Sequence, residues 1–246
     1  MYGHVPQLYA VFVHRRELLG WLAKGVYLDG PALETLNSMG YGELTGFKVT
    51  GYEDTDCIEV LNDHPLNAGQ EGRMRDCRQS FWRFPCAVLK PVSDGAVPLA
   101  KAVDYGNKTK AACSMGVFEN KLGGRVCVSG YYPWSFVLSH SKAEQCKNIV
   151  RWLTRDTIPA YISSLHKIAL WTREDENGQK ILTLLNQSMD TAEHLTLKVL
   201  TNYSKLRITD KNMTETVANC IGTDGEYKVF RLPALPAWSL VLAVTE

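Results

Sequence analysis

The chain has 246 residues, of which 45% are hydrophobic and 22% charged, enough apolar material for the cores of one or two soluble domains. Its formal net charge is +1 and its basic residues form no long run, so we expect no nucleic-acid partner. No stretch approaches the ~20 consecutive apolar residues that span a bilayer, so we expect no membrane partner.

The beginning of the chain carries an apolar patch that lacks the features of a secretory signal. Arg15, Arg16 and Glu17 follow the patch, and no small-residue cleavage site comes after it. The seven cysteines are an odd number and contain no C-x-x-C pair, which argues against a disulfide framework and a zinc knuckle. A reducing compartment is the simplest interpretation, so we favour a cytoplasmic location.

The first predicted elements alternate between helix and strand. Residues 15–24 fit a helix, and residues 26–28 fit a short apolar strand. Residues 29–31, Asp-Gly-Pro, then favour the start of a second helix. The aspartate or the glycine can cap the free amides there, and proline is harmless in the first turn. Gly40 ends this helix. The alternation predicts an α/β layer fold with at least partly parallel strands.

The middle of the chain mixes strand patterns with turns. Residues 62–80 are polar and rich in turn formers, so they are predicted to be a loop. Turns at residues 104–107 and 121–124 separate the last three strands, and the last two of these strands form a hairpin-like unit. The predicted strands lie within residues 47–61, 81–92, 97–103, 111–118 and 125–129.

A further helix is predicted to begin near residue 141. Ser141 and Glu144 have the spacing of a capping box, in which each side chain satisfies a backbone amide at the helix start. Apolar residues then recur at helical spacing on one face, and residues 156–159 end the helix. The domain boundary is placed there, with residues 1–158 in the first domain and residues 159–246 in the second.

The second domain has the period of strands. Residues 194–199 and 238–244 alternate between apolar and polar positions, which is typical of half-buried strands. The predicted strands and the turns between them indicate an antiparallel β-sandwich of about 80 residues. These strands lie at residues 165–172, 180–186, 194–199, 205–209, 226–232 and 238–244.

A thiol nucleophile is the first candidate for chemistry, because an α/β layer domain is compatible with an enzyme of the amidotransferase class. Such a nucleophile needs a cysteine on a strained strand-to-helix turn, with an oriented histidine beside it. Cys113 has strand-like neighbours and lacks the G-x-C-x-G elbow. A buried strand thiol is therefore the favoured interpretation.

Carboxylates and metal ligands give no stronger candidate. Glu43 lies between glycines that would let a ligand approach, but glycosidic cleavage needs two carboxylates about 5–9 Å apart. The favoured interpretation places Glu43 near the start of a short helix. The six histidines occur singly, without a metal-binding spacing. The sequence therefore predicts no catalytic residue, no cofactor and no metal.

Aromatic residues follow one of the predicted strands directly. Tyr131, Tyr132 and Trp134 lie at the kind of strand end where α/β domains place ligands, and aromatic rings stack on the flat face of a sugar. Aromatic clusters just before a domain linker more often fill the seam between domains. These three residues are thus candidates for a sugar contact or an interdomain contact, and the second is favoured.

Three segments resemble one known family when they are taken together. They are GVYLDGPALETLNSMGYGELTGF (25–47), LGGRVCVSGYYPW (122–134) and CKNIVRWLTRDTIPAYI (146–162). They resemble the domain that follows the catalytic barrel in the family 42 β-galactosidases and related glycoside hydrolases. Residues 160–246 are similar to the small β-sandwich that closes those chains.

The resemblance implies an amidotransferase-like (flavodoxin-like) α/β layer domain without the nucleophile, which takes part in trimer assembly. The catalytic glutamates of the family lie in a barrel of about 250 residues that has no match here, so no catalytic residue is carried over. Strands that such a domain would have before residues 15–24 are missing, so the domain is expected to be N-terminally incomplete.

The leading hypothesis is therefore a non-catalytic, assembly-supporting region of a glycoside hydrolase. Its expected partners are the catalytic barrel of the parent enzyme and two further copies in a homotrimer. The first alternative is a carbohydrate-binding module that uses the aromatic loop at residues 131–134. The second alternative is a thiol enzyme of the amidotransferase class.

Overall fold

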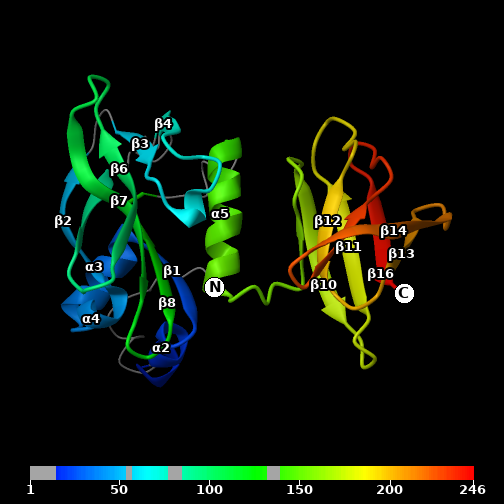
Figure 1. Ribbon diagram of the computed structural model, residues 1–246, viewed down its shortest axis with the longest axis horizontal. Helices are drawn as coiled ribbons and strands as arrows, with labels where there is room; N and C mark the ends of the chain where they lie inside the picture. The colour runs from blue at the N-terminus through cyan, green and yellow to red at the C-terminus, as the bar shows by residue number, and fades with distance from the viewer. Residues whose placement is uncertain (1–14, 54–56, 77–84, 132–138) are drawn as a thin grey trace. The chain divides into compact units, whose positions relative to one another are not determined.

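The computed structural model describes residues 15–53, 57–76, 85–131 and 139–246. The chain divides into two compact units, residues 1–156 and 157–246 (Figure 1). Among the described residues, strands far outnumber helices, so this part of the chain is mostly β.

The first unit is built on a six-stranded sheet and a two-stranded sheet. In spatial order, the strands of the larger sheet are β1 (Gly25–Asp29), β8 (Arg125–Ser129), β7 (Thr109–Glu119), β6 (Val97–Val103), β3 (Ile58–Leu61) and β4 (Met74–Asp76). The smaller sheet pairs β2 (Phe47–Glu53) with β5 (Cys86–Pro91). The described helices are α2 (Arg15–Leu22), α3 (Gly30–Ser38), α4 (Gly42–Thr45), the 3-10 helix η1 (Pro65–Asn67) and α5 (His140–Leu153).

The larger sheet is mostly antiparallel, and this corrects the predicted amidotransferase-like (flavodoxin-like) α/β layer fold. Among the described strands of this sheet, β1 and β8 alone run parallel, and the other pairs are antiparallel. Short turns join β6 to β7 and β7 to β8. A parallel pair needs a crossover connection of about a dozen residues or more, so these turns enforce antiparallel pairing. The helix–strand–helix alternation describes the first elements and does not extend to the rest of the unit.

The two longer helices begin at side-chain caps. Asp29 Oδ1 accepts a hydrogen bond from the Ala32 amide at 2.8 Å and Pro31 follows in the first turn, as the sequence predicts for α3. For α5 the predicted capping box is wrong: the cap is Ser139, whose Oγ accepts from the Lys142 amide at 3.2 Å. The helix therefore begins about half a turn before the expected position.

Helices cover both faces of the larger sheet. On one face α2, α3 and the two-stranded sheet pack against it, and α5 lies on the other (Figure 1). Successive residues of β8 show the division, because side chains of a strand point alternately to the two faces. Val126 and Val128 pack with Leu33 of α3, whereas Cys127 packs with Ile149 of α5.

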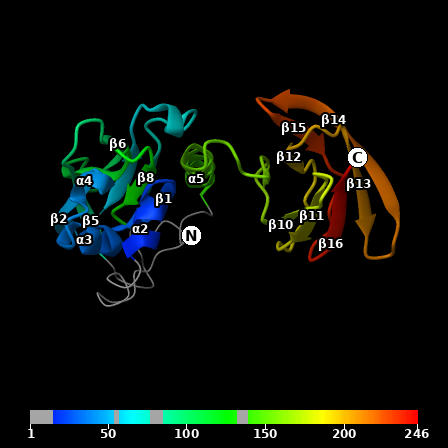
Figure 2. The ribbon, with the colours of Figure 1, turned by 90° about the horizontal axis from the view of Figure 1, so that it is seen from below.

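The second unit is one antiparallel sheet of eight strands. Its end strands β9 and β10 approach each other, so the sheet is nearly closed and resembles a barrel. In spatial order the strands are β10 (Ile168–Glu174), β11 (Lys180–Asn186), β16 (Leu240–Thr245), β13 (Lys205–Asp210), β14 (Glu215–Asp224), β15 (Tyr227–Arg231), β12 (Thr196–Leu200) and β9 (Ala160–Ile162). Figure 2 shows β11, β16 and β13 side by side.

The predicted β-sandwich therefore fits the second unit in part: the strands are antiparallel, but they form one continuous sheet. Its core consists of inward side chains such as Leu182, Leu184, Leu206 and Phe230, all with no exposed surface. The sequence does not predict β14, because most positions of this strand are exposed and it lacks the alternation of apolar and polar residues. No helix in the described ranges is long and apolar enough to cross a membrane.

Candidate functional site

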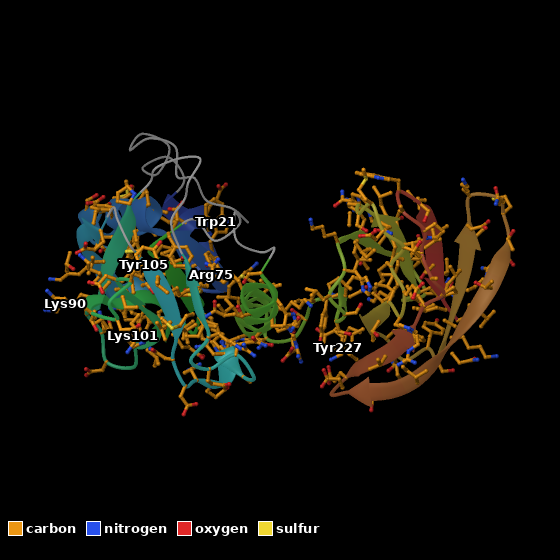
Figure 3. The ribbon with its side chains drawn as sticks, turned by 90° about the horizontal axis from the view of Figure 1, so that it is seen from above. Trp21, Arg75, Lys90, Lys101, Tyr105 and Tyr227 are labelled. Atoms are coloured by element: carbon orange, nitrogen blue, oxygen red, sulfur yellow. The ribbon has the colours of Figure 1, made fainter. Side chains whose placement is uncertain are left out.

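Five polar side chains meet in the interior of the first unit and form what we call the buried charge cluster: Glu59, Arg75, Tyr131, Lys142 and Gln145. They come from β3, β4, the segment after β8 and α5. Arg75 is labelled in Figure 3. Glu59, Lys142 and Gln145 have no exposed surface, so the cluster is shielded from solvent.

The Glu59 carboxylate is the centre of this cluster. Lys142 Nζ lies 3.1 Å from Oε1 and 3.3 Å from Oε2 of Glu59. Arg75 Nε donates to Glu59 Oε2 at 3.2 Å, and the Tyr131 hydroxyl donates to Oε1. One buried carboxylate thus faces two cations and one phenol, which is the compensation that a charge needs in a protein interior.

A second layer of hydrogen bonds ties the cluster to the backbone. Lys142 Nζ donates to Gln145 Oε1 at 2.5 Å, and Gln145 Nε2 donates to Asn67 Oδ1 at 2.7 Å. The Asn67 amide donates to the carbonyl oxygens of Asn62 and Leu99, both at 2.8 Å. The network therefore links α5 to η1 and to β6.

The protonation states follow from these contacts. Burial by itself would raise the pKa of Glu59, but the charges of Lys142 and Arg75 and the hydrogen bonds of the cluster lower it below its usual value. Burial, and then the charge of Glu59, raise the pKa of Tyr131 well above its usual value. The cluster therefore favours an ionised Glu59 carboxylate beside a neutral Tyr131 phenol.

The sequence analysis did not single out Glu59 or Lys142. Glu59 carries a signal in the sequence, because Leu61 lies two residues after it on the buried face of β3 and Cys57, also buried, directly precedes the strand. A charged residue on a buried strand face requires a partner. The partner, Lys142, is 83 residues away in the sequence, so local pattern could not identify it.

The second unit contains a cavity of about 320 Å³, which we call the barrel-end cavity. Residues of the segments 210–216 and 232–241 line it, except those at positions 213, 215, 237 and 238, together with Leu195 and Ile208. It lies at the end of the sheet where β13 and β15 end and where β12, β14 and β16 begin. Mouths of β-barrels are frequent locations for small-molecule sites.

The barrel-end cavity has an apolar floor and a polar rim. Its floor includes Leu195, Ile208 and Leu235, each no more than 4% exposed. Asp210 and Thr216 are on the rim. Asp210 lies two residues after Ile208 on β13, and Thr216 is paired with Ile208 across the strands, so both are on the same face of the sheet as Ile208. Further polar side chains on the same rim are Lys211, Asn212 and Thr214.

The loops around this cavity are fixed by hydrogen bonds. The buried Asn186 amide donates to the carbonyl oxygens of Asp190, Leu235 and Pro236, at 2.8, 2.9 and 3.1 Å. On the other side, Asp210 Oδ1 accepts from the amides of residues 212 and 214, at 2.8 and 2.9 Å. Hydrogen bonds within the protein therefore hold the backbone of the rim in place.

Two large apolar side chains extend from these loops into solvent. Met213 is 79% exposed and Trp238 is 63% exposed. Their φ angles are +62° and +55°, in the left-handed region that non-glycine residues seldom adopt. Trp238 Nε1 donates to the sulfur of Met189 at 3.2 Å. Such strained positions are found more often at binding sites than elsewhere.

The described residues include two of the candidate site residues of the sequence, Tyr131 and Glu43. Tyr131 is buried in the charge cluster of the first unit, and Tyr132 and Trp134 lie outside the described residues. Glu43 is in the first turn of α4, exposed and 2.6 Å from Lys121 Nζ. The hydrogen bond and the charge of Lys121 lower the pKa of Glu43.

Cys113 is a buried thiol of β7, as the favoured interpretation of the sequence states. Its Sγ donates to the Met115 carbonyl oxygen at 3.3 Å, and burial raises its pKa to about 12. It is therefore protonated at neutral pH and is a poor nucleophile. In the described ranges, no three His, Cys, Asp or Glu side chains are grouped so that they could hold a metal ion.

We expect iodoacetamide to react first with Cys220 among the described cysteines. Cys220 is partly exposed in β14, while burial raises the pKa values of Cys113, Cys127 and Cys146. Peptide mapping at about pH 8 should find Cys220 labelled roughly tenfold faster or more than any of these three. A buried cysteine that reacts as fast as Cys220 would contradict the structure, and a Cys220→Ser variant controls for the assignment of the fast site.

No protein-family model and no curated protein sequence matches this chain. Among solved structures, the chain is similar to α-L-fucosidase isoenzyme 2 from Paenibacillus thiaminolyticus, with a TM-score of 0.59 and 12% sequence identity. The likeness covers 94% of this chain and 38% of the fucosidase chain, so this chain spans well under half the length of that protein. At this identity the likeness shows a shared fold.

Proposed function

We propose that this chain is a non-catalytic region of a glycoside hydrolase, which supports a catalytic domain carried by another part of the protein. The likeness to a glycoside hydrolase is the observation that carries the proposal. It extends over 94% of this chain, and therefore over residues of both units, yet it accounts for only 38% of the fucosidase. The remainder of such a protein has room for a catalytic barrel of about 250 residues.

The chemistry of the first unit supports a structural role. Glu59, Lys142 and Gln145 are enclosed there, and hydrogen bonds join them to one another, to Arg75 and to Asn67. Glu43, the candidate catalytic carboxylate of the sequence, forms an ion pair with the exposed Lys121 on the surface. The finer form of the proposal comes from the sequence resemblance: an arrangement like that of the family 42 β-galactosidases, with the catalytic barrel as partner and three copies in the assembly.

Hydrolysis assays on this chain alone test the proposal. We expect the chain to release nitrophenol from nitrophenyl β-D-galactoside and nitrophenyl α-L-fucoside no faster than buffer does. Release that depends on the concentration of the chain and persists after further purification would contradict it. A Glu59→Gln variant is the control for such activity, because it alters a carboxylate that lies among cations in the interior of the first unit.

Sedimentation equilibrium tests the finer part of the proposal. A chain that contributes to trimer assembly should approach three times its mass of 27.5 kDa as its concentration rises. A measured mass that stays at that of one chain up to the highest concentration would contradict trimer assembly. The non-catalytic role would then still be tested by the hydrolysis assay.

A further inference from the structure

We propose that the barrel-end cavity of the second unit binds the ring of a neutral saccharide. This inference goes beyond the proposed function, because a region that supports assembly needs no ligand site. It rests on the cavity, on the chemistry of its lining and on the exposed tryptophan beside it.

The size of the cavity and its floor suit one sugar ring. Its volume of about 320 Å³ is at the lower end of the range of about 300–1,000 Å³ for small-molecule pockets. The floor of Leu195, Ile208 and Leu235 gives an apolar surface against which the C–H face of a pyranose can lie. A chain of several sugars would have to extend out of the mouth.

The rim provides the polar half of sugar recognition. Asp210 Oδ2 accepts hydrogen bonds, Lys211 Nζ donates them, and the hydroxyl of Thr216 does both. None of these three atoms has a hydrogen-bond partner among the described residues. Sugar hydroxyls are both donors and acceptors, so they match a mixed rim. The opposite charges of Asp210 and Lys211 favour a ligand without net charge.

Trp238 lies next to the cavity along the chain. Pro236 and Ser239 line the cavity on either side of it in the sequence, and Trp238 itself is exposed and outside the lining. The conformation of Trp238 costs free energy in two ways. Its backbone is in the left-handed region, and its apolar ring is exposed to water. Stacking on the face of a sugar would bury that surface, and this offers a reason for the strained conformation.

The site is also preorganised. The Asn186 amide joins the loop at residue 190 to Leu235 and Pro236, and Ala192 and Leu235 exchange two backbone hydrogen bonds, at 2.9 and 3.1 Å. A rim that is fixed before the ligand arrives loses little conformational entropy on binding.

Titration of the full chain with methyl β-D-galactopyranoside and with methyl α-L-fucopyranoside, followed by two-dimensional amide NMR, tests the inference. We expect saturable shifts of amides in residues 210–216 and 232–241 with at least one of the two glycosides. Trp238→Ala should weaken this binding by roughly tenfold or more, because it removes the stacking surface. Thr216→Val keeps the shape of the side chain and removes one hydroxyl, and should weaken binding by roughly 2- to 10-fold.

Trp171→Ala is the matched control. Trp171 is also an exposed tryptophan of the second unit, 54% accessible, but it lies on β10, and no residue of that strand lines the cavity. Its replacement should leave the affinity unchanged. Dispersed NMR spectra of each variant show that the fold is kept, so a lost shift reports binding and not unfolding.

Several outcomes would overturn the inference. The first is that neither glycoside shifts these amides at concentrations up to tens of millimolar, and the second is that Trp238→Ala and Trp171→Ala have equal effects. A third is that cyclohexylmethanol, a ring with one hydroxyl, binds as tightly as the glycosides and is insensitive to Thr216→Val, because the cavity would then be a site for apolar ligands. Failure of the proposed function appears as turnover in the hydrolysis assay and leaves these binding results unaffected.

Discussion

Replacing Lys142 by methionine should lower the free energy of unfolding of the first unit by about 3–5 kcal/mol. Methionine fills a similar volume but leaves the Glu59 carboxylate without the ammonium that lies 3.1 Å from it. It also leaves Gln145 Oε1 without its donor, while the rest of the network still holds it in place. Urea denaturation combined with amide hydrogen exchange should show the loss in the first unit and no change in the second.

A matched lysine of the same helix gives the control. Lys147 is also in α5 and its Nζ lies 2.8 Å from Glu144 Oε1, but both side chains are about a quarter exposed. Water compensates for the loss of such a pair, so Lys147→Met should change the stability by no more than about 1 kcal/mol. Equal effects of the two replacements would show that the buried charge cluster does not stabilise the unit in the way proposed.

The pH dependence of stability gives a second readout of the same cluster. The pKa of Glu59 is lowered in the folded protein, from an ordinary value of 4.5. Its ionised form therefore contributes stability that is fully present above that value and is lost as the pH falls through the lower folded pKa. The double variant Glu59→Leu, Lys142→Met removes the titrating carboxylate, so it should flatten this acid limb. It also leaves the Arg75 guanidinium without its carboxylate, so we expect it to be no more stable than Lys142→Met alone.

Replacing Gly124 by alanine should destabilise the first unit by about 3 kcal/mol or more. A Cβ at this position would lie 1.8 Å from the Leu22 carbonyl oxygen and 2.8 Å from the carbonyl carbon of Ala23, and backbone atoms cannot turn aside as a side chain can. Hydrogen bonds hold the two segments together: Asn120 Nδ2 donates to Leu22 O at 2.8 Å, and the Arg125 amide donates to Lys24 O at 2.7 Å.

Gly20→Ala is the control for Gly124→Ala and has the opposite expected sign. Gly20 is exposed in α2, and no atom lies within 4 Å of a Cβ built there. Alanine favours the helix, so the unfolding free energy should rise by about 0.5–1 kcal/mol. Urea denaturation of both variants measures the difference. A Gly124→Ala variant as stable as the unaltered chain would mean that the turn after β7 does not approach α2 so closely.

The fold class shows where inference from local pattern fails. Residues 15–40 read as helix, strand and helix, and the structure confirms α2, β1 and α3 there. Extending that pattern to an α/β layer fold was wrong, because the direction of each following strand depends on its partner. The turns after β6 and β7 were visible in the sequence, and their shortness was the better guide to antiparallel pairing.

The sequence by itself determined the features that depend on neighbouring residues. The helix start at residues 29–31, the buried thiol of Cys113 and the period-two strands of the second unit follow from local spacing and side-chain type. Only the tertiary structure decided which distant residues meet. Glu59 faces Lys142, and residues 210–216 and 232–241 enclose one cavity, because sheet pairing brings together segments whose separation along the chain carries no local signal. Contact in space depends on strand order and register, and the spacing of residues within one segment fixes neither.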